Sequence, residues 1–277
     1  MRRAPDFLPM WRVHRGFTLV EMIVSIVITG IIVAIVALFG RQQVDAYLDV
    51  GNRAELSDAA DTALRRIARD LQSALPNSVR VDATGRYLEF VPISDAGRYQ
   101  ADFGGDASDN PLDFGSSTDN SFRVFGPPVT INSGEQLVIF NLGLPGSDVY
   151  VGNNRKAANT GTNLQTVTYT VGAAQFPFPS PQSRFQIVAL PVSYVCDPTA
   201  GTIVRRTGYG FVGTQPTTNL GSLGGSSSIL VSDVSACAFS YAAAILQRNG
   251  LAVLRLTLTR NGESVELLHQ VEVLNTP

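Results

Sequence analysis

The feature that most constrains this 277-residue chain is an apolar run near its N-terminus that contains one carboxylate. Residues 17–39 include no charged side chain except Glu21. About 23 residues at 1.5 Å per residue form a helix of roughly 35 Å, which is long enough to cross the core of a bilayer. The run therefore predicts a membrane-spanning helix.

The charges before this run predict its orientation. The leader contains Arg2, Arg3, Arg12, His14 and Arg15, against one acidic residue, Asp6. By the positive-inside rule the leader stays in the cytoplasm and the chain after Arg41 crosses the membrane. A secretory signal peptide fits poorly, because the leader is long and polar, no Ala-x-Ala site follows, and Glu21 lies inside the run. An uncleaved single-pass anchor is the rival interpretation.

The segment Arg15-Gly16-Phe17-Thr18-Leu19-Val20-Glu21 resembles the class III signal of the type IV pilin and type II secretion pseudopilin superfamily. The resemblance implies that prepilin peptidase cleaves after Gly16 and that Phe17 becomes the N-methylated first residue. It also implies that Glu21 meets the N-terminal amine of a neighbouring subunit during assembly. A carboxylate within hydrocarbon is costly, so a functional partner is the default expectation for Glu21.

A helical period continues beyond the membrane segment. Apolar residues recur at three and four positions: Leu56, Ala60, Ala63, Leu64, Ile67, Leu71 and Leu75. The pairs Asp61–Arg65 and Arg66–Asp70 are spaced to interact on one exposed face. We expect the helix to end near Leu75, before Pro76. From Phe17 it would then have about 59 residues and a length of roughly 90 Å.

After Pro76 the apolar period changes from 3.6 to 2, which predicts strands. Residues 79–83 and 87–93 are expected to form a hairpin, and the dipeptides Asn249-Gly250 and Asn261-Gly262 to join a closing three-strand meander. The meander strands are expected at 237–247, 251–259 and 264–274, and further strands at 137–140, 165–171, 185–188, 193–196 and 202–206. Residues 95–120, 151–163 and 213–228 are rich in Gly, Asp, Asn and Ser and are expected to be mobile loops.

These patterns predict an α+β fold with a long N-terminal helix on an antiparallel β-rich head, and the resemblance of residues 15–21 implies that this fold is pilin-like. We expect a leader at 1–16, a transmembrane and assembly helix at 17–39, its continuation packed on the head at 40–76, and the globular head at 77–277. Gly40 and Gly51 are expected weak points between the two halves of the helix.

Composition restricts the class of function. The formal net charge is only −2 and the mature part loses the basic leader, so nothing indicates a nucleic-acid surface. About 220 residues remain after the membrane segment, enough for one substantial core. Cys196 and Cys237 are the two cysteines, and an exported pair favours one disulfide. A buried free pair and a metal site are the alternatives, and a metal site would need more ligands.

Signals for catalysis are weak, and we expect neither an enzyme nor a cofactor. His269 alternates with valines and a leucine, which favours a packing role over a general base. The pattern of residues 208–213 matches G-x-G-x-x-G, but Pro216 follows in place of a helix, which favours a glycine-rich turn. An acidic loop is a weak calcium candidate through Asp102, Asp106, Asp109 and Asp113, with Asp119 nearby.

A second resemblance narrows the family. Ala74-Leu75-Pro76-Asn77-Ser78-Val79-Arg80 and Leu88-Glu89-Phe90-Val91-Pro92-Ile93 are similar to O-type minor pilins of MSHA (mannose-sensitive haemagglutinin) pilus biogenesis. One departure is Leu38, where many major pilins have a proline. Residues 94–230 resemble nothing we know.

The resemblance implies a non-enzymatic structural subunit that initiates or extends a type IV pilus. Its implied partners are prepilin peptidase, other minor pilins, the major pilin and the inner-membrane assembly platform. Its implied location is the inner membrane of a Gram-negative bacterium, with the head in the periplasm, and then the filament at the cell surface. A minor pseudopilin of a type II secretion system and a membrane-anchored periplasmic adhesin or binding module stay open as alternatives.

Overall fold

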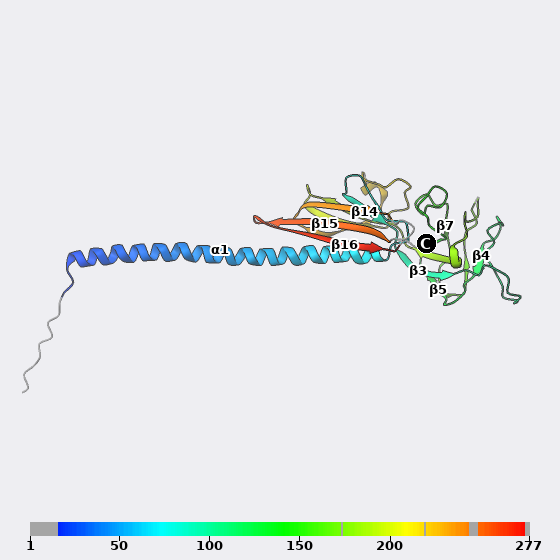
Figure 1. Cartoon of the computed structure of the whole chain (residues 1–277), viewed down its shortest axis with the longest axis horizontal. Helices are drawn as coiled ribbons and strands as arrows, with labels where there is room; N and C mark the ends of the chain where they lie inside the picture. Colours follow the sequence, from blue (N-terminus) through cyan, green and yellow to red (C-terminus); the bar gives the residue numbers. More distant parts are fainter. Residues whose placement is uncertain (1–15, 173, 219, 244–248, 275–277) are drawn as a thin grey trace, which may run out of the picture. The chain divides into compact units, whose positions relative to one another are not determined.

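The computed structural model describes residues 16–277 apart from 173, 219, 244–248 and 275–277. It has an α+β architecture, in which one long helix is followed by antiparallel strands (Figure 1). The chain divides into two compact units, and the boundary lies between Gly51 and Asn52.

The helices and strands follow one another in a simple order. They are α1 (Leu19–Gln72), β1 (Arg80–Val81), β2 (Tyr87–Phe90), β3 (Ile93–Arg98), β4 (Ser121–Arg123), β5 (Val129–Ile131), β6 (Gln136–Val138), β7 (Arg155–Ala157), β8 (Gly161–Leu164), β9 (Thr166–Thr168), η1 (Pro181–Ser183), β10 (Arg184–Val188), β11 (Val192–Asp197), β12 (Thr202–Thr207), η2 (Leu220–Leu223), β13 (Ser226–Ser232), β14 (Val234–Ala242), β15 (Gly250–Arg260) and β16 (Glu263–Val273).

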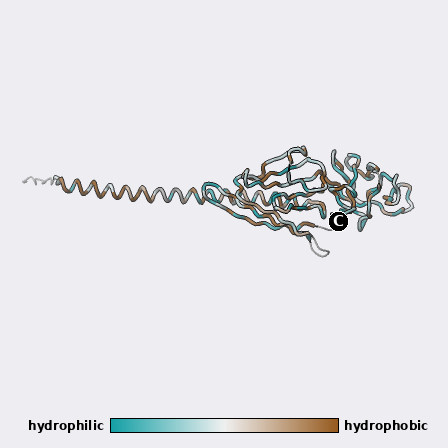
Figure 2. Tube along the Cα trace, turned by 90° about the horizontal axis from the view of Figure 1, so that it is seen from above, coloured by the Kyte–Doolittle hydropathy of each residue, from teal (hydrophilic) through white to brown (hydrophobic). Residues whose placement is uncertain are grey.

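Helix α1 meets two different environments along its length. Its first part is mostly apolar, as the hydropathy colouring of Figure 2 shows, and its described side chains are exposed. From Asn52 onward only one stripe is apolar, and all seven residues predicted to face the core are buried. The intrahelical pairs also form, with Arg65 Nε 2.6 Å from Asp61 and Arg66 Nε 3.3 Å from Asp70.

The second part of α1 is held to the head by a charged anchor as well as by apolar packing. One carboxylate oxygen of Asp70 accepts hydrogen bonds from the Tyr194 hydroxyl and from Arg205 Nε, each at 2.8 Å. Tyr194 and Arg205 belong to β11 and β12, so this carboxylate links the helix to the middle of a sheet. Burial and the neighbouring carboxylate of Asp70 raise the pKa of Tyr194, so its hydroxyl stays a donor.

The helix ends at Gln72, three residues before the predicted end at Leu75. The backbone N–H of Leu75 donates to the carbonyl of Val91 at 2.7 Å, and Ile93 N–H donates to the carbonyl of Ser73 at 2.8 Å. The chain therefore exchanges helical hydrogen bonds for pairing with residues 91–93. Leu75 is still fully buried, so its predicted place in the core is correct although its predicted helical state is not.

Two antiparallel sheets share one core with the second part of α1. The five-stranded sheet has the order β1-β2-β11-β12-β13, and the three-stranded sheet has the order β14-β15-β16. Leu56, Ile67 and Leu71 of the helix are buried with Phe90 and Leu254 of the two sheets. Figure 1 shows β14, β15 and β16 beside this part of the helix. Burial of the apolar stripe is the main stabilising term here.

A second group of strands contains its own core within the same unit. It comprises the sheet β3-β10-β6-β7 and two ribbons, β4-β9 and β5-β8. Phe122 and Phe185 lie at its centre, with ring centroids 5.1 Å apart in an edge-to-face arrangement. A smaller cluster that includes Leu75, Val91 and Val188 forms a third core region.

One of the two predicted Asn-Gly turns is confirmed. Arg260 pairs with Glu263 across Asn261-Gly262, whose φ angles are 53° and 86°, as a type I′ turn requires. The prediction for Asn249-Gly250 is wrong, because Gly250 lies within β15 and pairs with Val273. Ala242 pairs with Leu251, so a longer connection precedes β15; the predicted strand end at 247 lies outside the described residues.

The other predicted strands are mostly confirmed, with altered bounds. Those at 185–188, 193–196 and 202–206 correspond to β10, β11 and β12, and those at 137–140 and 165–171 are shortened to β6 and β9. The hairpin at 79–93 forms, but Pro92, which lacks a backbone N–H, separates β2 from β3.

The predicted loops contain more structure than expected. Residues 95–120 begin with the end of β3, residues 151–163 contain β7 and the start of β8, and residues 213–228 contain η2 and the start of β13. These strands are short and polar, and they are held by backbone pairing. Alternation of apolar residues is therefore absent from them. Strands β4 and β5 do alternate, with Phe122, Val129 and Ile131 buried, but each has only three residues, which is too short for the period to be recognised.

A buried polar cluster fixes the connection between β12 and β13 against the five-stranded sheet. Glu89 of β2 is fully buried and accepts hydrogen bonds from Arg80 Nε at 2.6 Å and from the Tyr209 hydroxyl at 2.8 Å. The Tyr209 hydroxyl also contacts Ser193 Oγ. Arg80 donates to the carbonyls of residues 212 and 213 at 2.8 and 2.7 Å. Burial raises the pKa of Glu89, an effect that Arg80 and Tyr209 oppose.

We expect Tyr209→Phe to lower the free energy of unfolding by about 1–3 kcal/mol, because Glu89 and Ser193 each lose a buried partner. The measurement is urea unfolding of the full-length protein in detergent, followed by near-ultraviolet circular dichroism. Tyr87→Phe, at a half-buried tyrosine of β2, is the matched control and should change stability by less than about 0.5 kcal/mol. Equal effects of the two substitutions would contradict the role of the cluster.

Candidate functional site

The candidate site begins where helix α1 begins. Thr18 immediately precedes the first helical residue, and its Oγ1 accepts a hydrogen bond from the backbone N–H of Glu21 at 3.2 Å. This is the N-cap contact of a Thr-x-x-Glu capping box, which satisfies one of the free N–H groups of the first turn. Sequence analysis assigned no role to Thr18, although the spacing of Thr18 and Glu21 is the signal for one.

Glu21 lies in the first turn of α1 and is the one acidic residue there. A negative charge at this end of a helix interacts favourably with the helix dipole. Ser25, one turn later, donates its hydroxyl to the backbone carbonyl of Glu21 at 2.7 Å. This bond and the one to Thr18 hold the backbone of Glu21 in the first turn of the helix, and its side chain is exposed.

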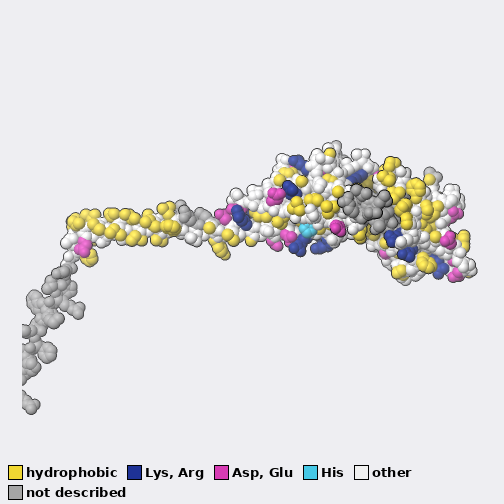
Figure 3. Space-filling model, in the orientation of Figure 1, with side chains coloured by type: hydrophobic (Ala, Val, Ile, Leu, Met, Phe, Trp, Pro, Cys, Tyr) yellow, Lys and Arg dark blue, Asp and Glu magenta, His cyan; other side chains and the backbone are white. Residues whose placement is uncertain are grey.

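Leu19–Gly40, a stretch of 22 residues, is long and apolar enough to cross a membrane. Figure 3 shows apolar side chains covering the visible face of this part of the helix. The described side chains between Phe17 and Phe39 are all exposed. Such a surface is unfavourable in water, so it requires lipid or other apolar helices around it. The stretch is consistent with a membrane anchor.

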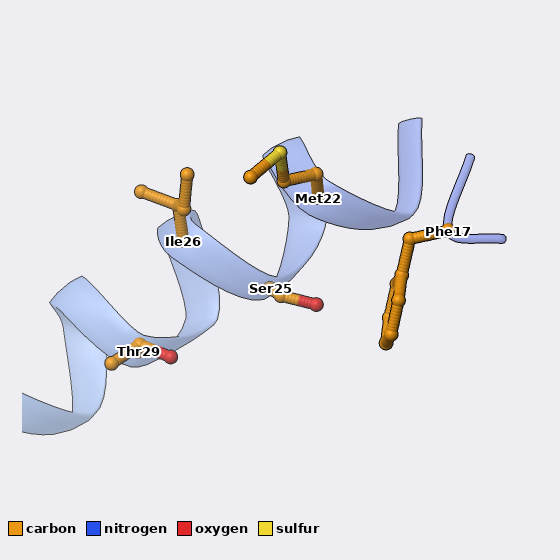
Figure 4. Close-up of a pocket in the computed structure, with 5 residues that line it drawn as sticks. All are labelled: Phe17, Met22, Ser25, Ile26 and Thr29. Atoms are coloured by element: carbon orange, nitrogen blue, oxygen red, sulfur yellow. The ribbon is translucent and has the colours of Figure 1, made fainter. Parts of the chain in front are cut away.

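One face of this helix is hollowed beside Phe17. Met22, Ser25, Ile26 and Thr29 line the hollow together with the Phe17 ring (Figure 4). These four helical residues have the spacing i, i+3, i+4 and i+7, which places them on one face. Small polar side chains at Ser25 and Thr29 leave room between the larger apolar ones, so another helix can insert a side chain here.

The two cysteines are joined in the structure. Cys196 at the end of β11 and Cys237 in β14 form a disulfide, with Cα atoms 6.5 Å apart and a sequence separation of 41. It links the five-stranded sheet to the three-stranded sheet, the two sheets that cover the helix. Closing a loop of this size stabilises the fold by about 4 kcal/mol in the chain-entropy description.

The acidic loop uses its carboxylates to hold its own backbone. Asp109 accepts from Gln100 Nε2 at 2.6 Å and from the N–H groups of Gly104 and Asp106 at 2.7 and 2.9 Å. Asp113 caps a turn at Gly115, and the Asp102 carbonyl accepts from Gln100. Among the described residues, no three His, Cys, Asp or Glu side chains converge as a metal site.

The remaining sequence candidates have packing roles. His269 lies on the less exposed face of β16, opposite Leu254 of β15. Among the described residues, no α-helix follows residues 208–213, only the short 3-10 helix η2, and Tyr209 within them is buried against Glu89, as a turn that packs on a sheet requires. The buried cluster around Glu89 was missed, because its members are far apart in sequence and each is ordinary in its local context.

Comparisons with known proteins identify the N-terminal signal. A family model described as the prokaryotic N-terminal methylation motif matches residues 11–37. The match covers the end of the leader, the Gly16–Phe17 junction, Glu21 and most of the apolar helix. It supports a type IV pilin-like or pseudopilin-like protein and favours a structural role over an enzymatic one. The curated proteins and the solved structures gave no significant match.

We expect the disulfide to form in the exported protein. Non-reducing peptide mapping should recover the peptides of Cys196 and Cys237 linked, and reduction should separate them. Reduction should also lower the urea concentration at the midpoint of unfolding. The corresponding loss in the free energy of unfolding should be up to about 4 kcal/mol. Two thiols that alkylate freely in the folded exported protein would contradict this pairing.

Proposed function

We propose that this protein is a minor pilin, a structural subunit that helps to initiate or extend a type IV pilus of the MSHA type after processing by prepilin peptidase. The observation that carries the proposal is the N-terminal methylation motif on an exposed, predominantly apolar helical segment with Glu21 in its first turn. Cleavage after Gly16 would create an amine on Phe17, which is then methylated.

The mechanism follows from the physical chemistry of the helix. The charged Glu21 carboxylate in hydrocarbon is unfavourable without a counter-charge. An amine at the start of a neighbouring subunit supplies that charge, and low dielectric strengthens the attraction although desolvation offsets part of it. The contact sets the axial register of adjacent helices, whose apolar faces then pack in a bundle. Other minor pilins, the major pilin and the inner-membrane assembly platform are the proposed partners.

Retention of Glu21 supports a position beneath another subunit. A subunit at the extreme tip has no neighbour above it whose amine needs a carboxylate. We therefore place this protein in the inner membrane, with its head in the periplasm, and afterwards in the filament below its tip. A minor pseudopilin of a type II secretion system is the second candidate, favoured by the same motif, and the genes adjacent to this one would distinguish the two. A membrane-anchored adhesin would keep its leader attached.

The first test concerns processing. Gly16→Arg should leave the leader attached and the protein in the inner membrane, because the residue before the proposed cleavage site is no longer small. Mass spectrometry of the N-terminal peptide is the measurement, and the wild type should begin with methylated Phe17. Gly51→Arg is the control, since Gly51 is exposed in α1 with open space around it, and should be processed normally. A cleaved Gly16→Arg protein would contradict the prepilin interpretation.

The second test concerns assembly. Glu21→Val should be inserted and cleaved normally, since it removes a charge from the apolar segment. It should nevertheless be recovered poorly with other pilins, because the partner for the neighbouring amine is gone. The measurements are co-purification and a count of surface filaments in a strain with only the mutant copy. Val24→Ala, a change without loss of charge at an exposed residue of the same segment that does not line the hollow, is the control. Normal piliation with Glu21→Val would exclude the carboxylate from the mechanism.

A further inference from the structure

Among the described strands, β13 is an edge of the five-stranded sheet. It pairs with β12 on one side, from Thr207↔Ser226 to Thr202↔Ser232, and it is last in the strand order. On an edge strand, alternate residues direct their backbone N–H and C=O groups away from the sheet. These groups are complementary to the backbone of another extended segment.

The first half of β13 lacks the features that normally protect an edge. Residues 226–228 are serines with exposed side chains, and Ile229 after them is 65% exposed. The whole strand contains no charged residue and no proline. By contrast, β16, at the end of the three-stranded sheet, has Glu263, Glu266 and Glu272 along its length. Because charged side chains on an edge strand discourage pairing with another chain, β16 is protected against such pairing and β13 is not.

The edge is also held in a fixed conformation. Before β13, Arg206 donates to the carbonyls of Leu220 and Gly224, at 2.5 and 3.3 Å. After it, Asp233 accepts hydrogen bonds from Arg260 at 2.9 and 2.7 Å. A register shift opposite Ile203 and Val204 leaves Leu230 as a bulge, which ends the regular part of the ladder. Residues 226–229 are therefore a short, preformed template.

We propose that β13 receives an extended strand from the head of a neighbouring subunit, with Ile229 as the apolar anchor of the contact. This proposal rests on the function proposed above. The small serine side chains permit close approach, and backbone hydrogen bonds supply the affinity in this mode of recognition. The occupant is a different edge and not a second β13. Two copies paired through the same strand would be related by a two-fold axis, whereas subunits whose helices bundle in one direction make head-to-tail contacts.

The first experiment identifies the occupant. A benzophenone amino acid replaces Ile229 in the full-length protein, expressed with its pilin partners, and a second protein has it in place of Leu268, an exposed leucine on β16. After irradiation, mass spectrometry should find position 229, and not position 268, linked to the head of another pilin subunit. Linkage of position 229 only to a second copy of β13, or no linkage while the protein co-purifies with pilins, would overturn the proposal.

The second experiment measures the contribution of the contact. Ile229→Lys places a charge on the edge and should reduce recovery with the partner pilins at least about tenfold, since a buried unpaired charge is costly. Leu268→Lys is the matched control and should be recovered like the wild type. Recovery of the wild-type protein with the partner pilins separates the proposed function from the proposed strand contact. If the wild type is not recovered with them, the proposed function is contradicted. If the wild type, Ile229→Lys and Leu268→Lys are recovered equally, only the strand contact is contradicted.

A folding defect in Ile229→Lys would be detected by loss of the Cys196–Cys237 disulfide. In that case the strand contact is tested by amide hydrogen exchange of the wild-type protein. The outward amides of residues 226–229 should exchange more slowly in the assembled protein than in the isolated protein. Unchanged exchange on assembly would overturn the proposal.

Discussion

Burial of one stripe of α1 between two sheets is the interaction on which the head depends. Leu56, Ile67 and Leu71 have no exposed surface, and each belongs to the core shared by the five-stranded and three-stranded sheets. The helix therefore supplies part of the core that the two sheets share. Asp70 adds direction to this packing, because its hydrogen bonds to Tyr194 and Arg205 fix the helix relative to β11 and β12. The disulfide between β11 and β14 then joins the two sheets around the helix.

The first part of the same helix is exposed instead of buried. No residue from Phe17 to Phe39 is buried within the described chain, although almost all are apolar. A continuous helix with these two surfaces is stable only if its first part is surrounded by lipid or by other helices. Glu21 favours surrounding helices over lipid, because the amine of a neighbouring subunit can neutralise its charge whereas hydrocarbon cannot. On the proposed function, cleavage creates that amine, so processing and assembly are coupled through one charge.

The sequence predicted what depends on period and on local chemistry. The helical stripe from Leu56 to Leu71, the Asn261-Gly262 turn and strands β10 to β12 all have strong local signals, and all are present. The helix end was missed because a tertiary contact, Leu75 with Val91, replaced helical hydrogen bonds. Strands β7 and β8 were missed because they are short, polar and held by pairing, and β13 was missed because it begins with three serines. The cluster of Glu89, Arg80 and Tyr209 had no local signal, since it exists only after distant segments meet.

The N-terminal motif is a local signal, and it says little about which subunits this protein selects as neighbours. The N-terminal motif is a general signal, and its match ends at residue 37, so it cannot by itself distinguish one pilin-like subunit from another. A contact between a carboxylate and an amine is equally undiscriminating, because every processed subunit has the amine. Selection among neighbours therefore has to come from the heads. On the proposed contacts, backbone pairing at β13 would add little discrimination of its own, but it would require a partner strand at the correct height, which the Glu21 contact would set. The two contacts together would specify a neighbour more strictly than either alone, because one would fix the axial register and the other would require a complementary strand edge.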